Sequence, residues 1–317
     1  MQEKEGGRKR RKESEEERGL DTRTGTIGYR ALNKDGTFNV RKHNVPLLER
    51  INMFHSLVTM SWPSFFAILV TVYFGINLFF ASLYVIIGTE HLTGIRGTTT
   101  MEKFLDSFFF SAQTITTLGY GQVAPLNLPA NIVAATESLL GLLLFALATG
   151  LMYGRFSKPY ASIKYSTFGL IAPYLDINGF MFRVVNPKNN QLIEVEASVT
   201  LSMQRKDNPD SREFHLLELE RSKVILFPTM WTIVHPITEN SPLLGISPDE
   251  MMERDAEFLI FIKAFDESFS QTVYSKSSYK ANEIKWGEKF TYLTKRHGSG
   301  VSIDVGGIDL TYKAALN

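Results

Sequence analysis

The residues best suited to chemistry lie together in one short stretch, from Thr114 to Gly121, which is rich in hydroxyl side chains and glycine. A potassium ion that loses its water shell needs fixed oxygen ligands, and backbone carbonyls can supply them. Glycine permits the unusual backbone that this requires. One chain supplies only one wall of an ion path, so the stretch predicts a homotetramer with K+ as the permeant ion. The predicted filter residues are Thr117, Leu118, Gly119, Tyr120 and Gly121.

The segments around this stretch carry almost no charge. Residues 57–89 contain no Asp, Glu, Lys or Arg, and residues 107–154 contain only Glu137. About 20 apolar residues span the roughly 30 Å hydrocarbon core of a bilayer. We therefore expect membrane-spanning helices at 62–88 and 129–153, which exclude a soluble single-core protein.

A shorter apolar helix is expected at 104–115, directly before the filter. It is too short to cross a bilayer, and the glycines that follow it end the helix, so a re-entrant segment is predicted. The expected fold is an α + β membrane protein. Its predicted parts are a partly disordered cytoplasmic tail at 1–43, an interfacial slide helix at 44–60, a two-span pore domain at 61–155 with pore helix and filter at 104–121, and a cytoplasmic β-sandwich at 163–317.

The sequence leaves alternatives for the first two segments. The charged tail could form a lipid or nucleic-acid patch instead of a solvated chain, and the amphipathic helix could pack on a neighbouring domain instead of the membrane surface. In the last segment, apolar and polar residues alternate cleanly from Glu194 to Met203, as in a half-buried strand. A further strand is expected at 224–237.

Charge and cysteine content narrow the function further. Residues 1–50 contain 13 Lys and Arg, whereas the loops between the spans contain two, which predicts that both termini are cytoplasmic. The net charge of +1 gives no reason to expect a nucleic-acid partner. The chain has no cysteine, which excludes a disulfide framework and a thiol nucleophile. We expect no cofactor and no enzymatic activity.

A family resemblance follows from the filter together with motifs elsewhere in the chain. The chain from about Arg41 to Phe290 resembles inward-rectifier potassium channels of the prokaryotic branch. This resemblance implies passive K+ conduction in the inner membrane of a prokaryote, with a gate at the inner-helix crossing controlled by the cytoplasmic domain and membrane lipids. The motifs are Ser61-Trp62-Pro63, Arg155-Phe156-Ser157-Lys158-Pro159, Trp231 to Ile237 continuing into Ser241-Pro242-Leu243, and Tyr279 to Gly287.

The resemblance implies roles for residues of the inner span. Phe145 stands where strongly rectifying animal members carry an acidic residue that attracts Mg2+ and polyamines, which implies weak block and weak rectification. Leu151 and Tyr153 fall at the expected gate, although Tyr153 could instead be an interfacial tyrosine. Gly141 and Gly150 could act as hinges or only permit close packing.

Glu137 is the one ionisable residue of the inner span, and such residues usually face a bundle interior or a cavity. We expect it to brace the filter or tune the cavity field, with direct ion binding as the alternative. The resemblance also implies that Gln113 and Val123 replace a charged pair that animal members carry behind the filter.

Basic residues near the inner membrane surface are the expected lipid contacts. Animal members bind phosphoinositide at positions matching Arg155 and Lys158, but two further basic positions of those members are not basic here. The resulting hypothesis is that anionic lipid binds Arg155, Lys158, Arg41 and Lys42, each contributing about 1 kcal/mol. The alternative is that these charges only set the topology.

Two features of the cytoplasmic segment remain open. His235 and His215 could sense pH or be structural strand residues. Glu194 and Glu196 could concentrate cations in a vestibule or form a solvated strand face. Three other functions are the alternatives to an inward-rectifier potassium channel: a poorly selective cation channel, a channel gated through Rossmann-type domains, and a membrane-anchored β-sandwich receptor that conducts nothing.

Overall fold

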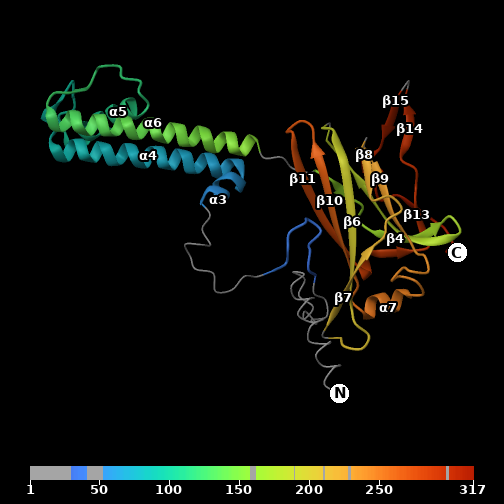
Figure 1. Ribbon diagram of the computed structural model, residues 1–317. Helices are drawn as coiled ribbons and strands as arrows, with labels where there is room; N and C mark the ends of the chain where they lie inside the picture. The colour runs from blue at the N-terminus through green and yellow to red at the C-terminus, as the bar shows by residue number, and fades with distance from the viewer. Residues whose placement is uncertain are drawn as a thin grey trace. The chain divides into compact units, whose positions relative to one another are not determined.

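The computed structural model describes residues 30–40, 53–157, 162–188, 190–209, 211–227, 230–297 and 300–317. The chain divides into two units (Figure 1). The membrane unit comprises the described residues of 43–158, and the β-rich unit comprises those of 1–42 and 159–317. Residues 1–29 and 44–52, which include most of the predicted tail and the first half of the predicted slide helix, lie outside the described residues.

The membrane unit contains two long helices, α4 (Trp62–Ile87) and α6 (Leu128–Phe156), both long and apolar enough to cross a membrane. A 16-residue helix, α5 (Thr100–Ile115), packs against both of them, and the short helix α3 (Met53–Thr59) packs against α6 (Figure 1). Between α4 and α5, the 3-10 turn η1 (Thr89–His91) leads into β1 (Leu92–Thr93), which pairs with β2 (Ala124–Pro125). This arrangement confirms the predicted fold of two spans around a shorter helix.

Local sequence signals explain where these helices begin. The Ser61 side chain accepts from the Ser64 backbone N–H at the start of α4, and Asn127 does the same for Ala130 at the start of α6. The Thr99 hydroxyl and the Glu102 carboxylate form a reciprocal capping box at α5. This cap starts the helix before residue 104, where the sequence predicted it to begin.

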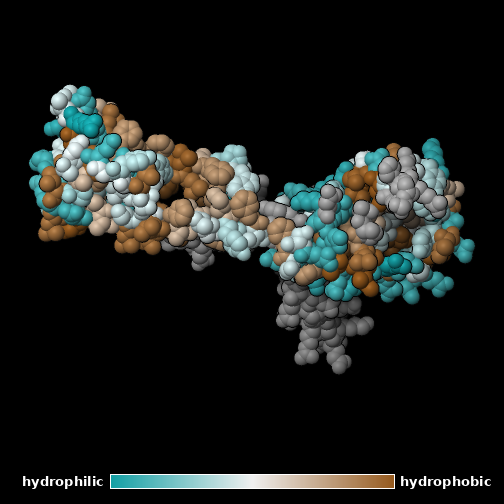
Figure 2. All heavy atoms as spheres, turned by 90° about the horizontal axis from the view of Figure 1, so that it is seen from above, coloured by the Kyte–Doolittle hydropathy of each residue, from teal (hydrophilic) through white to brown (hydrophobic). Residues whose placement is uncertain are grey.

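Many apolar side chains of α4 and α6 are exposed, and Figure 2 shows hydrophobic patches on the membrane unit among paler and hydrophilic ones. Its buried cluster is small and centres on Phe80, Tyr84 and Phe110. Such an exposed apolar surface suits contact with lipid tails and neighbouring subunits.

The β-rich unit is built on two five-stranded sheets. The first has the order β11-β10-β6-β7, with β8 also paired to β6, and the second has the order β12-β4-β5-β3, with β9 also paired to β5. Their bounds are β3 (Lys164–Tyr165), β4 (Gly169–Tyr174), β5 (Ile177–Val185), β6 (Leu192–Gln204), β7 (Arg212–Leu217), β8 (Lys223–Phe227), β9 (Met230–Pro236), β10 (Glu257–Asp266), β11 (Gln271–Lys280) and β12 (Ile284–Trp286). The smaller elements are α7 (Pro248–Glu253), η2 (Ala281–Glu283), β13 (Glu288–Phe290), β14 (Thr294–His297), β15 (Gly300–Ile303), η3 (Val305–Gly307) and β16 (Thr311–Lys313).

One continuous apolar cluster lies between the two sheets. Strand β6 contributes Val195, Ala197, Val199 and Leu201, the apolar face that its alternation predicted. The facing sheet contributes aromatic residues, among them Phe180, whose ring stacks on that of Phe258 at 4.0 Å. The β-rich unit is therefore a β-sandwich with its own core.

Candidate ion-conduction pathway

The stretch after α5 has the backbone that the filter hypothesis needs. Thr117, Gly119 and Gly121 have φ angles of 57°, 55° and 76°, whereas Leu118 and Tyr120 between them do not have positive φ. In an ordinary strand, successive peptide groups face opposite ways. Alternation of left-handed with right-handed residues lets them face the same way, as a row of ion ligands must. Within the single chain, nothing lies within 4 Å of a Cβ placed on either glycine. Glycine is therefore needed here for its positive φ angle and not because a side chain would clash.

The filter residues are exposed in the single chain. Leu118 is 56% exposed and Tyr120 is 69% exposed, which is unusual for bulky side chains in a rigid loop. The turn is held from α5, where the Gln113 carbonyl accepts from the Leu118 backbone N–H at 2.9 Å. The single chain therefore leaves the Leu118 and Tyr120 side chains largely uncovered.

An open hollow of about 550 Å³ lies beneath the filter, between α4 and α6. Thr117, Phe145 and Tyr73 are among its lining residues, and none of the lining residues is charged. Phe145 is 74% exposed in the single chain. An apolar cavity of this kind has no group that attracts a polyvalent cation.

Behind the filter, four polar side chains form a buried network across three helices. Glu137 of α6 accepts from the Tyr84 hydroxyl of α4 at 2.7 Å and hydrogen-bonds to the Ser111 hydroxyl of α5. Ser111 lies 3.0 Å from the Asn77 side-chain oxygen of α4. All four side chains are fully buried. The sequence analysis singled out Glu137 but missed its three partners, although Asn77 is as isolated in its apolar span as Glu137 is in its own.

One turn further along α6, the helix backbone touches the end of α5. A Cβ on Gly141 would lie 2.2 Å from the Ile115 carbonyl oxygen, too close for any side chain. On Gly150 it would meet nothing within 4 Å. Close packing is therefore the structural role of Gly141, and the structure gives no such role to Gly150.

The C-terminal end of α6 carries the predicted gate residues. Tyr153 is 73% exposed and Leu151 is half-buried. Gly154 lies beside Phe54 and Val58 of α3, so this end of α6 is in contact with α3.

Arg155 is buried against protein groups, although the sequence predicted a lipid contact for it, and its Nε has no hydrogen-bond partner among the described residues. Its Nη2 donates to the Met60 carbonyl at 2.8 Å and its Nη1 donates to the Leu57 carbonyl. The guanidinium carbon lies 4.5 Å from the ring centres of both Trp62 and Phe65, and the residue is only 8% exposed. The other three predicted lipid contacts, Lys158, Arg41 and Lys42, lie outside the described residues.

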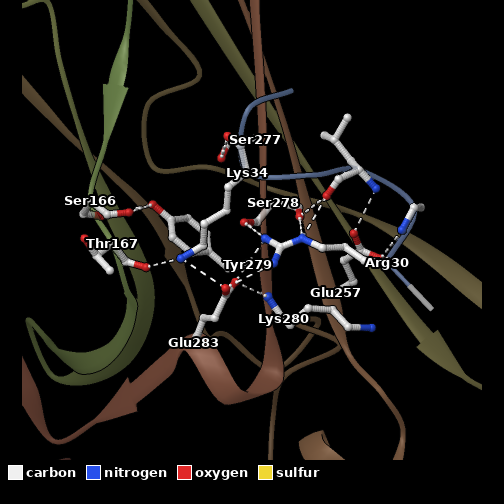
Figure 3. Close-up of polar contacts among 12 residues, drawn as sticks. Arg30, Lys34, Ser166, Thr167, Glu257, Ser277, Ser278, Tyr279, Lys280 and Glu283 are labelled. Atoms are coloured by element: carbon white, nitrogen blue, oxygen red, sulfur yellow. Dashed lines mark hydrogen bonds and ion pairs between the residues drawn. The ribbon is translucent and has the colours of Figure 1, made fainter. Parts of the chain in front are cut away.

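In the β-rich unit, the segment 30–40 packs on the sheet that contains β10 and β11 (Figure 3). Arg30 forms two hydrogen bonds of 3.1 Å with the Glu283 carboxylate, and Lys34 contacts the same carboxylate at 3.1 Å. Glu257 accepts from the Ala31 backbone N–H at 3.0 Å. Burial alone raises the pKa of Glu283, but donors from Lys280, Arg30 and Lys34 together hold it below its usual value. The sequence analysis did not predict this contact.

The two histidines and the acidic strand face of this unit have different surroundings. His235 is 3% exposed, its Nδ1 contacts the Glu218 carbonyl, and its Nε2 lies 2.8 Å from the Ser241 hydroxyl. Burial lowers the pKa of His235 and so favours the neutral ring, although the Glu218 carbonyl acts in the opposite direction. His215 is 40% exposed along its side chain. Glu194 pairs loosely with Lys223 at 3.8 Å, and both are largely exposed.

Comparison with known proteins accounts for both units. Residues 66–158 match the family described as "Ion channel", and residues 163–316 match the "Inward rectifier potassium channel C-terminal domain". The inward rectifier potassium channel Kirbac3.1 of Paramagnetospirillum magnetotacticum is 33% identical over 264 residues, which cover 82% of this chain and 88% of the relative. The chain belongs to the inward rectifier potassium channel family.

Animal relatives match as well. The G protein-activated inward rectifier potassium channel 2 of Mus musculus is 27% identical over 311 residues, covering 90% of this chain and 72% of the relative. Membership of this family makes the chain a potassium channel and membrane protein and confirms that it is not an enzyme. The predicted family is therefore confirmed, and the Rossmann-type and non-conducting alternatives are excluded.

Proposed function

We propose that four copies of this inward rectifier chain form a K+-selective pore whose filter is Thr117 to Gly121. The alternation of the sign of φ along Thr117–Gly121 carries this proposal, because it occurs where the chain passes between two membrane helices. The exposure of Leu118 and Tyr120 supports assembly, since neighbouring copies would cover these side chains.

Rubidium-86 uptake into proteoliposomes loaded with potassium chloride tests the proposal. We expect uptake that barium blocks and that excess external sodium does not compete away. Crosslinking of the same preparation should give a tetramer. Barium-insensitive uptake, or equal flux of sodium through a verified tetramer, contradicts it.

The gate is proposed at Leu151 and Tyr153, where four copies would bring eight bulky side chains to the pore axis and exclude water. The exposure of the Tyr153 side chain supports this. Tyr153→Ala should increase rubidium uptake, while Phe156→Ala, on another face of the same turn, should not. The cytoplasmic domain and membrane lipids are proposed to control this gate, with Gly150 available for bending of the helix.

Weak rectification is proposed from the uncharged lining of the hollow beneath the filter, which includes Phe145. Block by Mg2+ or polyamines should accordingly be weak. Phe145→Asp should introduce voltage-dependent block by internal spermine, whereas Phe145→Asn, of equal size without the charge, should not. Strong spermine block of the unmodified channel contradicts the proposal.

For Arg155 the structure favours a different role from lipid binding. Its donors end on two carbonyls at the α3–α4 junction and its face is enclosed by two aromatic rings, which supports mechanical coupling between α3 and the inner helix. Anionic lipid is proposed to act through Lys158, Arg41 and Lys42. Arg155 would contribute to lipid binding only when its hydrogen bonds to the two carbonyl groups are broken. A flux assay over increasing anionic lipid content, with each residue neutralised in turn, separates these roles.

The membrane location is proposed as the inner membrane of a prokaryote with both termini cytoplasmic. The excess of Lys and Arg in residues 1–50 supports this orientation. Tags at either end should resist protease in intact spheroplasts and be cleaved after lysis.

A further inference from the structure

The buried network behind the filter contains more acceptors than donors if Glu137 is ionised. The Ser111 hydroxyl oxygen contacts both the Asn77 side-chain oxygen, at 3.0 Å, and one Glu137 carboxyl oxygen. A serine hydroxyl carries one hydrogen, and neither an amide oxygen nor a carboxylate can donate. One of the two contacts would then bring two oxygens together with no hydrogen between them.

Turning the Asn77 amide does not supply the missing hydrogen without a loss elsewhere. Its nitrogen donates to the Tyr73 carbonyl at 2.7 Å. Exchanging the amide nitrogen and oxygen would place two oxygens face to face at that position. The Tyr84 hydroxyl is also committed, because it donates to the second Glu137 oxygen at 2.7 Å.

We propose that Glu137 is a neutral carboxylic acid and that, through Ser111, it positions the pore helix that carries the filter. With a proton on Glu137, every contact has one hydrogen, and the donors run in one direction. Tyr84 donates to Glu137, Glu137 to Ser111, Ser111 to Asn77, and Asn77 to the Tyr73 carbonyl. The proposal rests on the proposed function in one respect, namely that the filter conducts K+.

The surroundings agree with an uncharged group. Glu137 is fully buried within one chain, so a neighbouring copy cannot reach it and an ion in the path cannot touch it. The titratable side chain that faces it is Tyr84, and the described residues offer it no Lys, Arg or His within hydrogen-bonding distance. A lone carboxylate buried this way is costly, whereas a hydrogen-bonded neutral acid is not.

Helix α5 connects the hydrogen-bond network to the filter, because Ser111 lies on α5 and the filter follows the end of this helix. Ser111 lies four residues before Ile115, whose carbonyl touches Gly141 one turn beyond Glu137. The inner helix therefore holds the pore helix at two points, and the filter follows directly from its end. A neutral Glu137 acts on selectivity through this position and adds no field along the ion path.

Two substitutions of equal size test the role. In Glu137→Gln the amide nitrogen can donate to Ser111 and the amide oxygen can accept from Tyr84, so the network keeps its hydrogens. In Glu137→Leu both contacts are lost. We expect Glu137→Gln to keep rubidium-over-sodium selectivity within about twofold of the unmodified channel and Glu137→Leu to lose about tenfold, the equivalent of one buried hydrogen bond.

Infrared spectroscopy of the unmodified channel tests the proton directly and does not depend on the variants folding. At neutral pH we expect the carbonyl band of a protonated carboxyl group, absent from Glu137→Gln and retained in Glu90→Gln, which changes an exposed glutamate. Absence of the band, or selectivity lost equally in the Gln and Leu variants, overturns the proposal. If the unmodified channel shows no selective uptake, the proposed function fails, and the band still decides whether Glu137 is protonated.

Discussion

The two units of this channel each hold an inserted segment in place, and they do so with different chemistry. In the membrane unit, α5 is held by a hydroxyl, an amide and a carboxyl group and by direct backbone contact at Gly141. In the β-rich unit, segment 30–40 is held by ion pairs whose side chains keep 18–41% of their surface exposed. Charges near water cost little to pair, whereas inside a membrane helix bundle neutral groups must do the same work.

Gly141→Ala should give the largest effect, because the added methyl group has no space beside the Ile115 carbonyl. Moving α6 away would separate the network and shift the filter, at an expected cost of about 3 kcal/mol or more. Loss of tetramer and of rubidium uptake would be measured together.

Gly150→Ala is the matched control, since it adds the same methyl group to the same helix where nothing is near. We expect its tetramer to remain intact. If Gly150→Ala were the more harmful substitution, hinge bending and not packing would be the chief demand on this helix.

Arg155 is the exception within the membrane unit, because it is a charge that is paired with carbonyl groups and aromatic rings. Arg155→Lys keeps the charge but replaces the planar fork, which donates from two nitrogens and stacks on the rings, with a single ammonium nitrogen. We expect the detergent-solubilised channel to lose about 2 kcal/mol of stability, while the response of flux to anionic lipid stays as in the unmodified channel. A stable Arg155→Lys channel with an altered lipid response would instead assign the residue to lipid binding.

We call the Arg30–Lys34–Glu283 contacts the ion-pair clamp, and the Asn77–Ser111–Glu137 contacts the neutral clamp. The ion-pair clamp should respond to salt and pH, whereas the neutral clamp should not. Glu283→Gln removes the shared partner of Arg30 and Lys34 and should cost about 1–2 kcal/mol, with the loss shrinking in high salt. The pKa of Glu283 is lower in the folded state, so its contribution is complete above the ordinary value of 4.5 and is lost as pH falls below it.

Chemical denaturation at several pH values checks this, with Lys223→Gln as the control because that residue makes a loose, exposed pair. The control should change stability by less than about 0.5 kcal/mol. Equal salt dependence for Glu283→Gln and the unmodified channel would remove the distinction between the two clamps.

Local patterns were enough to predict the parts of the fold that depend on neighbouring residues. The filter, the two spans and the alternation of β6 could be predicted from the sequence because each is a short-range pattern. The expected strand at 224–237 is wrong, since β8 pairs with β6 and β9 pairs with β5 in the other sheet. Pro228 was the available signal, because proline has no N–H to donate within a strand.

Contacts between distant residues were not predictable in the same way. Arg30 and Glu283 lie 253 residues apart, and no periodicity links them. The partners of Glu137 depend on which helix faces meet, which a single apolar span does not specify. The early start of α5 was within reach, since Thr99 and Glu102 form a recognisable capping pair.

His235 is the corresponding exception in the β-rich unit, because it is a buried titratable group whose two hydrogen-bond partners, the Glu218 carbonyl and the Ser241 hydroxyl, are uncharged. Burial lowers its pKa below the ordinary 6.5, so protonation opposes folding. Stability should be flat above about pH 6.5 and should decline as pH falls below it. His235→Gln should remove this slope, while His215→Gln, at an exposed position, should retain it. The contrary result would be a change in rubidium uptake between neutral and mildly alkaline pH that is present in the unmodified channel and abolished in His235→Gln. This result would make His235 a pH sensor.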